Sequence, residues 1–184
     1  MKSRVDLSTY DNSWYDPGPK WKRLLWYVCN VIVFKSSFFL FGKLKTRVLK
    51  SFGAKIGKGV IIKPNVNIKY PWLLTIGDNT WIGEGVWIDC LASVHIGNNV
   101  CLSQGALILN GNHDFKKTSF DLVLKPIVIN DGAWIGARSV VTQGVTIGSH
   151  AVLTAGSVTS KDLKTYGIYK GVPAVQIKER HIEA

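Results

Sequence analysis

The chain has 184 residues, of which 46% are hydrophobic, a size and composition that fit one domain with its own core and exclude a disordered tail protein. Its formal net charge of +11 is concentrated in residues 1–58, which hold 12 basic and 3 acidic side chains. The three cysteines, Cys29, Cys90 and Cys101, are widely spaced and form neither a disulfide framework nor a CxxC metal motif. We interpret them as small hydrophobic residues of a protein in a reducing compartment.

Residues 1–50 form a predicted N-terminal arm that is both apolar and basic. Its first 19 residues are polar and do not resemble a cleavable signal peptide, so we expect a cytoplasmic protein. Residues 24–41 are apolar apart from Asn30, Lys35, Ser36 and Ser37. Because a charge in mid-stretch disfavours a membrane-spanning helix, the pattern favours a helix or helical hairpin that lies in the membrane interface.

The basic residues of this arm have two interpretations. In the first, they face anionic lipid at the inner face of the cytoplasmic membrane; these residues are Lys22, Arg23, Lys43, Lys45, Arg47 and Lys50. In the second, the helices cover the open end of the domain that follows, or pack across a subunit boundary. We expect no nucleic-acid partner, because the segment contains no known nucleic-acid-binding motif.

An internal repeat occupies most of the chain, with the predicted domain at residues 51–160. Aliphatic residues recur at positions 56, 62 and 68, again at 76, 82 and 88, again at 96, 102 and 108, and then at 129, 135, 141, 147 and 153. The step between groups is 20 residues. Six residues suit a short strand and a turn, so three units predict one triangular coil of a β-solenoid. Five coils at roughly 4.8 Å spacing predict a prism about 24 Å tall, whereas a barrel or sandwich would show hairpin turns.

Two segments depart from the repeat. Residues 109–126 interrupt it, and we expect a loop that protrudes from the rigid prism, a position where solenoids carry functional residues. From residue 161 to 184 the repeat ends, which predicts a closing strand and a short tail over the last coil.

Several motifs together resemble a known family. They are the segment WIGARSVVTQGVTIGSHAVLTAGSV at 134–158 with SKD at 160–162, FGAKIGKGVIIKPNVNIKYPWLLTIGD at 52–78, NGNHD at 110–114 and GVPAVQIKER at 171–180. This set resembles the left-handed β-helix acetyltransferases, and within them the colanic acid biosynthesis (WcaF-like) type. The resemblance implies an all-β, left-handed parallel β-helix, a homotrimer, acetyl-CoA bound in a groove between neighbouring prisms, and an active site shared by two chains.

The catalytic residue that the resemblance implies is His113, within the protruding loop. Transfer of an acetyl group to a sugar hydroxyl requires a base with a pKa near neutrality, and histidine provides one. His113 coincides with the histidine that family members use as general base, and one of its ring nitrogens needs a hydrogen-bond acceptor such as a backbone carbonyl. The adjacent Asp114 is a second candidate, for contact with the acceptor or for anchoring the loop.

The resemblance also implies residues that bind acetyl-CoA. Ala137 and Ala155 match the small residues along which pantetheine lies, and Trp134 matches an aromatic wall beside the thioester, although packing within the prism is an alternative role for this tryptophan. Ser160 and Lys161 match the nucleotide end, and Lys178 is a candidate phosphate partner. Thr154 and Val175 depart from residues that many relatives carry, so these cofactor contacts are less well defined than the base.

We therefore expect an O-acetyltransferase that takes acetyl from acetyl-CoA, needs no metal, and modifies a sugar hydroxyl in exopolysaccharide biosynthesis. The acceptor is expected to be a sugar linked to a lipid or a nucleotide, with a free sugar or a xenobiotic hydroxyl as the alternative. Two remote alternatives are a γ-type carbonic anhydrase and a non-enzymatic β-solenoid. The first needs a third histidine beside His95 and His113, and the second needs flat threonine ladders that the chain lacks.

Overall fold

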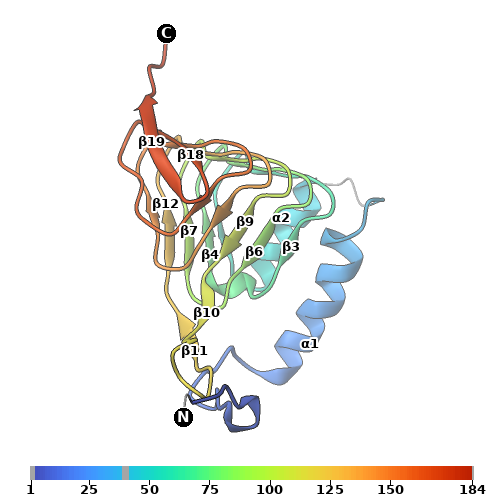
Figure 1. The fold of residues 1–184 in the computed structure, drawn as a ribbon. Coiled ribbons are helices and arrows are strands. Elements are labelled where there is room, and N and C mark those ends of the chain that lie inside the picture. The colour runs from blue at the N-terminus through green and yellow to red at the C-terminus, as the bar shows by residue number, and fades with distance from the viewer. Residues whose placement is uncertain (1–2, 39–41, 184) are drawn as a thin grey trace.

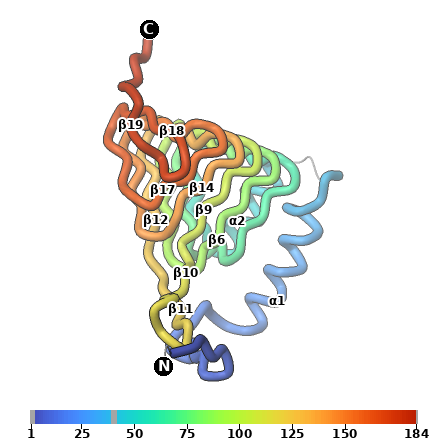
Figure 2. Tube along the Cα trace, in the orientation of Figure 1, coloured from blue at the N-terminus to red at the C-terminus, as the bar shows by residue number. Residues whose placement is uncertain are grey.

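The computed structural model describes residues 3–38 and 42–183 and shows a triangular β-solenoid with a helical arm (Figure 1). Residues 39–41 of the predicted arm, its first two residues and residue 184 lie outside the described residues. The coils stack as a left-handed parallel β-helix, which confirms the predicted fold class (Figure 2).

Each side of the triangle is a parallel sheet of very short strands. Sheet A contains β1 (Lys55–Ile56), β4 (Leu74–Ile76), β7 (Val94–Ile96), β12 (Ile127–Ile129) and β15 (Thr146–Ile147). Sheet B contains β2 (Ile61–Ile62), β5 (Trp81–Ile82), β8 (Cys101–Leu102), β13 (Trp134–Ile135), β16 (Val152–Leu153), β18 (Gly167–Gly171) and β19 (Ala174–Glu179). Sheet C contains β3 (Asn67–Ile68), β6 (Trp87–Asp89), β9 (Leu107–Leu109), β14 (Val140–Val141) and β17 (Val158–Thr159).

The strand register follows the repeat found in the sequence. Ile56 pairs with Ile76 and Ile76 with Ile96, so partners lie 20 residues apart. Beyond the interruption, Ile96 pairs with Ile129 and Ile129 with Ile147. All five of these isoleucines are buried and point into the prism. Each such burial contributes roughly 1.5–3 kcal/mol, so the aliphatic stack supplies the driving force for coiling.

The two ends of the solenoid are closed differently. At the C-terminal end, β18 adds to sheet B and β19 returns antiparallel to it, so the structure has two strands where the sequence predicted one (Figure 1). At the N-terminal end, helix α2 (Gly42–Ser51) packs on the first coil with Leu49 fully buried. A short 3-10 turn, η3 (Pro71–Leu73), lies between β3 and β4.

Lys45 of α2 does not face lipid, contrary to the interpretation from sequence. Its side chain is fully buried, and its Nζ donates a hydrogen bond of 2.9 Å to the carbonyl of Lys63 in the first coil. Burial lowers the pKa of this amine, because the charged form loses solvation. This lysine is therefore part of the cap on the open end, which agrees with the second interpretation for this part of the arm.

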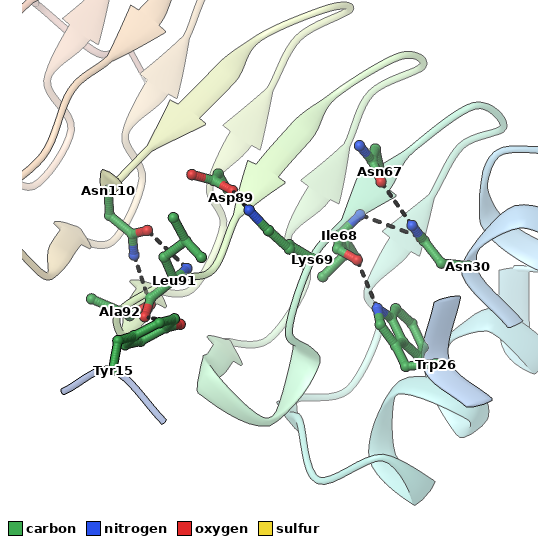
Figure 3. Close-up of polar contacts among 10 residues, drawn as sticks. All are labelled: Tyr15, Trp26, Asn30, Asn67, Ile68, Lys69, Asp89, Leu91, Ala92 and Asn110. Atoms are coloured by element: carbon green, nitrogen blue, oxygen red, sulfur yellow. Dashed lines mark hydrogen bonds and ion pairs between the residues drawn. The ribbon is translucent and has the colours of Figure 1, made fainter. Parts of the chain in front are cut away.

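Helix α1 (Lys20–Cys29) and the π-helical turn η2 (Asn30–Phe34) run along the side of the prism next to sheet C (Figure 1). Residues 26, 30 and 34 are spaced at about one helical turn and all three side chains are buried. Trp26 Nε1 donates to the Ile68 carbonyl at 2.8 Å, and Asn30 Nδ2 donates to Asn67 Oδ1 at 2.7 Å (Figure 3). These two contacts attach α1 and η2 to β3.

The opposite side of α1 is uncovered in the described chain. The exposed apolar side chains there include Trp21, Leu25 and Val28 of α1 and Ile32 of η2, of which Ile32 is 61% exposed. No helix among residues 3–38 and 42–183 is long and apolar enough to cross a membrane.

Candidate functional site

The interruption of the repeat folds as a β-hairpin, β10 (Gly111–His113) and β11 (Leu122–Leu124), that projects from the corner between sheets C and A (Figure 1). Asn110, fully buried at its base, donates from Nδ2 to the Ala92 carbonyl at 2.6 Å and accepts from the Leu91 amide at 3.0 Å (Figure 3). Gly111 lets the hairpin approach this coil closely, because a Cβ there would lie 2.6 Å from Leu91 Cδ1 and the leucine side chain would have to move. The hairpin is thus tied to the coil below it.

The hairpin holds the imidazole of His113 in one orientation. His113 Nδ1 lies 2.9 Å from the carbonyl oxygen of Phe120. Because a carbonyl only accepts, Nδ1 carries the hydrogen and Nε2 keeps its lone pair. The Phe120 ring stacks on the imidazole, with 4.4 Å between the ring centroids and an angle of 7° between the ring planes. The Tyr10 ring packs beside the same imidazole, with 5.7 Å between the ring centroids. Such an imidazole is arranged to accept a proton at Nε2.

Phe120 itself adopts an uncommon backbone conformation, with φ of +52°. A bulky side chain in the left-handed region is strained by about 1–3 kcal/mol, so the surrounding loop must hold it there. Asp121, next to it, accepts hydrogen bonds from Lys117 Nζ at 2.7 Å and Ser119 Oγ at 2.6 Å. These two hydrogen bonds lower the pKa of the Asp121 carboxyl. The same hydrogen bonds stabilise the tip of the hairpin next to Phe120.

Asp114 lies at the start of the same tip. Its Oδ1 accepts from the Lys116 amide at 3.1 Å, and its own amide donates to the Asp121 carbonyl at 2.8 Å. The sequence left two roles open for Asp114, contact with the acceptor and anchoring of the loop. These contacts fit the second role.

The N-terminal segment, residues 3–19, forms a wall beside the hairpin that the sequence interpretation missed. Three aspartates each accept a hydrogen bond from the amide two residues later: Asp6 from Ser8, Asp11 from Ser13, and Asp16 from Gly18. These local turns bend the segment, which includes the 3-10 turn η1 (Leu7–Thr9). The repeated Asp-x-Ser/Gly pattern, with aromatic residues between, is the signal in the sequence that this segment is ordered.

Two contacts fix this wall to the rest of the site. The Asp6 amide donates to the Thr118 carbonyl at 2.9 Å, at the hairpin tip. Tyr15 Oη donates to the Leu91 carbonyl at 2.7 Å, at the coil that also holds Asn110 (Figure 3). Burial raises the pKa of the Tyr15 hydroxyl, which therefore stays protonated as a donor.

Between the wall and the hairpin lies a cavity of about 570 Å³, a volume suited to a sugar. Its lining includes His113 from the hairpin, Asn12, Ser13 and Asp16 from the wall, and Arg23 of α1 with Lys69 of the loop after β3. Hydroxyl, amide and charged groups of this kind recognise hydroxyl-rich ligands through hydrogen bonds.

The residues predicted to bind acetyl-CoA lie elsewhere on the chain. Trp134 is on the outer face of sheet B, 47% exposed, and its Nε1 donates to Ser103 Oγ at 2.8 Å. Ala137 and Ala155 follow β13 and β16, one coil apart at the corner between sheets B and C, where Gly156 donates to the Ala137 carbonyl at 2.8 Å.

The remaining three predicted residues are exposed: Ser160 and Lys161 follow β17, and Lys178 lies on β19. All six residues are within the described chain, and none of them lines the cavity at His113. The structure therefore groups Ala137 with Ala155 but does not bring either to His113 within one chain.

Comparison with known families gives two matches along the solenoid. Residues 126–161 match the model described as bacterial transferase hexapeptide (six repeats). Residues 74–109 match the hexapeptide repeat of succinyl-transferase. The two matches lie on either side of the hairpin.

Among individual proteins, the putative colanic acid biosynthesis acetyltransferase WcaF of Escherichia coli K12 is 38% identical over 156 residues, 85% of this chain and 86% of that protein. A galactoside acetyltransferase solved with coenzyme A superposes with a TM-score of 0.77 at 27% identity, over 86% of this chain and 80% of that one. VCA0836 of Vibrio cholerae, a hexapeptide-repeat acetyltransferase solved with acetyl coenzyme A, has the same fold, with a TM-score of 0.79 at 24% identity over 87% of each chain.

The role of Asn110 gives a first prediction. Asn110→Ala removes the donor to the Ala92 carbonyl and leaves the Leu91 amide with the Asp89 carbonyl alone, which should cost about 1–3 kcal/mol and loosen the hairpin. We expect faster proteolysis between residues 114 and 120 and a lower melting temperature. Asn112→Ala is the control, because its exposed side chain accepts only from the adjacent His113 amide. Equal proteolysis of the two variants would contradict the anchoring role.

Proposed function

The chain belongs to the hexapeptide-repeat acetyltransferases, with acetyl-CoA as acyl donor, and we propose that it acetylates a sugar hydroxyl in exopolysaccharide biosynthesis of the colanic acid type. The observation that carries this proposal is the His113 imidazole, whose Nδ1 is held by the Phe120 carbonyl at 2.9 Å beside a polar cavity of about 570 Å³. The 38% identity to WcaF supports the choice of acceptor class.

The proposed reaction is direct transfer. The acceptor hydroxyl oxygen attacks the thioester carbonyl carbon of acetyl-CoA while Nε2 of His113 takes the hydroxyl proton. The carbon–sulfur bond of the tetrahedral intermediate then breaks, and the imidazolium returns its proton to the departing thiolate. The products are the sugar acetate ester and free CoA, and His113 regains its starting tautomer. Phe120 is a positioning residue, because its carbonyl stabilises the imidazolium through Nδ1.

We propose that two chains build each site. Ala137, Ala155 and Trp134 provide the pantetheine surface, Ser160 and Lys161 contact the nucleotide end, and Lys178 contacts a phosphate. Because Trp134, Ala137 and Ala155 lie on sheet B or at its corner with sheet C, whereas His113 projects from the corner between sheets C and A, a neighbouring copy must supply one of the two sets. A closed trimer places one corner of each chain against another corner of the next.

Replacing the base gives a direct test of this function. His113→Ala should reduce thiol release from acetyl-CoA, in the presence of a sugar acceptor, by a factor on the order of 10² or more. Binding of acetyl-CoA should be unchanged, since His113 acts on the acceptor hydroxyl and is not one of the proposed cofactor contacts. Turnover that persists in a folded variant would refute His113 as the base.

A mixing experiment tests the shared site. Ala155→Trp should block pantetheine and be as inactive as His113→Ala. When the two are co-expressed, about three quarters of randomly assembled trimers are mixed, and each mixed trimer holds one intact interface of three, so about a quarter of the wild-type turnover should return. No recovery in trimers that contain both chains would place the whole site within one chain.

We also propose that the arm contacts the membrane surface through the uncovered side of α1. The exposed residues Leu25, Val28 and Ile32 would enter the lipid, and the exposed cations Lys43, Arg47 and Lys50 would face anionic headgroups.

Point substitutions test this contact better than a deletion, because Trp26 and Leu49 of the arm are part of the core. Leu25→Glu with Val28→Glu should release the protein from anionic liposomes in a sedimentation assay. Val175→Glu with Ile177→Glu, at two exposed positions on β19, makes the same charge change at the other end of the solenoid and should have no effect. A wild-type chain that ignores anionic liposomes would show that the arm serves only as a cap.

A further inference from the structure

The cavity at His113 continues into a second cavity along α1. This second cavity, of about 500 Å³, lies between α1 and sheet C. Arg23, Lys69 and Tyr70 line both cavities, so the two meet at these three residues. Together they form a groove that begins at His113, passes Arg23 and Lys69, and ends along α1.

The lining of this groove has an excess of positive charge. Its four cations are Lys20, Arg23, Lys35 and Lys69. Of these, only Lys69 makes an ion pair within the described chain, with Asp89 Oδ1 at 3.5 Å (Figure 3). Asp89 itself lines neither cavity, and Asp16, a carboxylate that does line the cavity at His113, accepts a hydrogen bond from the Gly18 amide. Two acidic groups therefore face four cations, and an anionic ligand would balance the difference.

Arg23 also carries an unsatisfied donor. Its Nε is buried and has no hydrogen-bond partner among residues 3–38 and 42–183. A buried donor without an acceptor costs about 1–3 kcal/mol, and a phosphate oxygen is an acceptor that a guanidinium binds well. Arg23 lies at the junction of the two cavities and lines the first of them together with His113. Its unpaired donor is therefore available to a ligand that also reaches the base.

Beyond Arg23 the groove becomes apolar. Leu24 and Tyr27 of α1, Val31 of η2 and Trp87 of β6 line it, and Leu24 and Tyr27 are about two-thirds exposed, at 67% and 66%. The order along the groove is therefore a general base with polar groups, then Lys20, Arg23 and Lys69, then an apolar wall, with Lys35 at the far end of η2.

We propose that the cations at this junction form a diphosphate-binding subsite, and that the acceptor is a glycosyl diphosphate. This inference rests on the proposed function, since it places the sugar in the cavity at His113. Arg23 and Lys69 contact the diphosphate, Lys20 and Lys35 add charge, and the carrier beyond the diphosphate lies against Leu24, Tyr27 and Val31. A lipid and a nucleoside share this diphosphate chemistry, and the choice of acceptors in the test separates them.

The test compares acceptors on variants of the full-length enzyme. The acceptors are one sugar as its free form, as its nucleoside diphosphate and as its short-chain polyprenyl diphosphate. Arg23→Gln and Lys69→Gln should each lower kcat/KM for a diphosphate-linked acceptor by about tenfold or more, and leave the free sugar within about twofold of the wild type. Arg23→Lys, which keeps the charge, should recover part of the loss. A preference for either diphosphate carrier over the free sugar supports the subsite and identifies the carrier.

Lys22→Gln is the matched control, because this neighbouring lysine lies over the Trp72 ring at 4.5 Å and lines neither cavity. Binding of inorganic pyrophosphate, measured by calorimetry, gives a readout independent of turnover and should weaken in Arg23→Gln but not in Lys22→Gln. Equal kcat/KM for free and diphosphate-linked sugars, or equal losses on all acceptors in Arg23→Gln, would overturn the subsite while leaving the acetyltransferase intact. Failure of His113→Ala to reduce turnover on any acceptor would refute the proposed function instead.

Discussion

The stacking of one aliphatic residue on another, coil after coil, is the interaction on which the structure depends. Strands of two or three residues are too short to be stable alone, and each gains its hydrogen bonds only from the coils above and below. Ile56, Ile76, Ile96, Ile129 and Ile147 form one such column on sheet A. Because the column continues across the hairpin without a shift, the chain can leave the solenoid at residue 109 and return at residue 127 with its register intact.

This rigidity explains why the base sits on an insertion. Inside the prism there is room only for small or aliphatic side chains, so a histidine with a free ring nitrogen has to project outside. Asn110 joins the hairpin to the coil, and the strained Phe120 supplies both the carbonyl and the ring that orient the imidazole. The strain at Phe120 is maintained by hydrogen bonds at the tip that involve no solenoid residue, so orientation of the base is a property of the hairpin and the N-terminal wall.

The arm has three different sides around α1 and η2. Trp26 and Asn30 fasten α1 to β3, Leu24 and Val31 line the groove, and the side with Leu25 is uncovered. Sequence composition alone merges these sides into one apolar and basic segment. Once they are separated, Arg23 lines the groove, and Lys45 is part of the cap and does not face lipid as first expected.

The sequence by itself determined the solenoid, its 20-residue coil, the place of the interruption and the candidate base, because each depends on periodicity or on a motif that is local in the chain. The tertiary structure alone decided what surrounds the base. Phe120 is seven residues from His113, and Tyr10 and Arg23 are about a hundred residues away, so no local pattern connects them. The same holds for the separation of Ala137 and Ala155 from His113, since the corner on which a residue lies depends on the path of the folded coil. Long-range contacts of this kind arise from packing, and packing is decided only when the whole chain is folded.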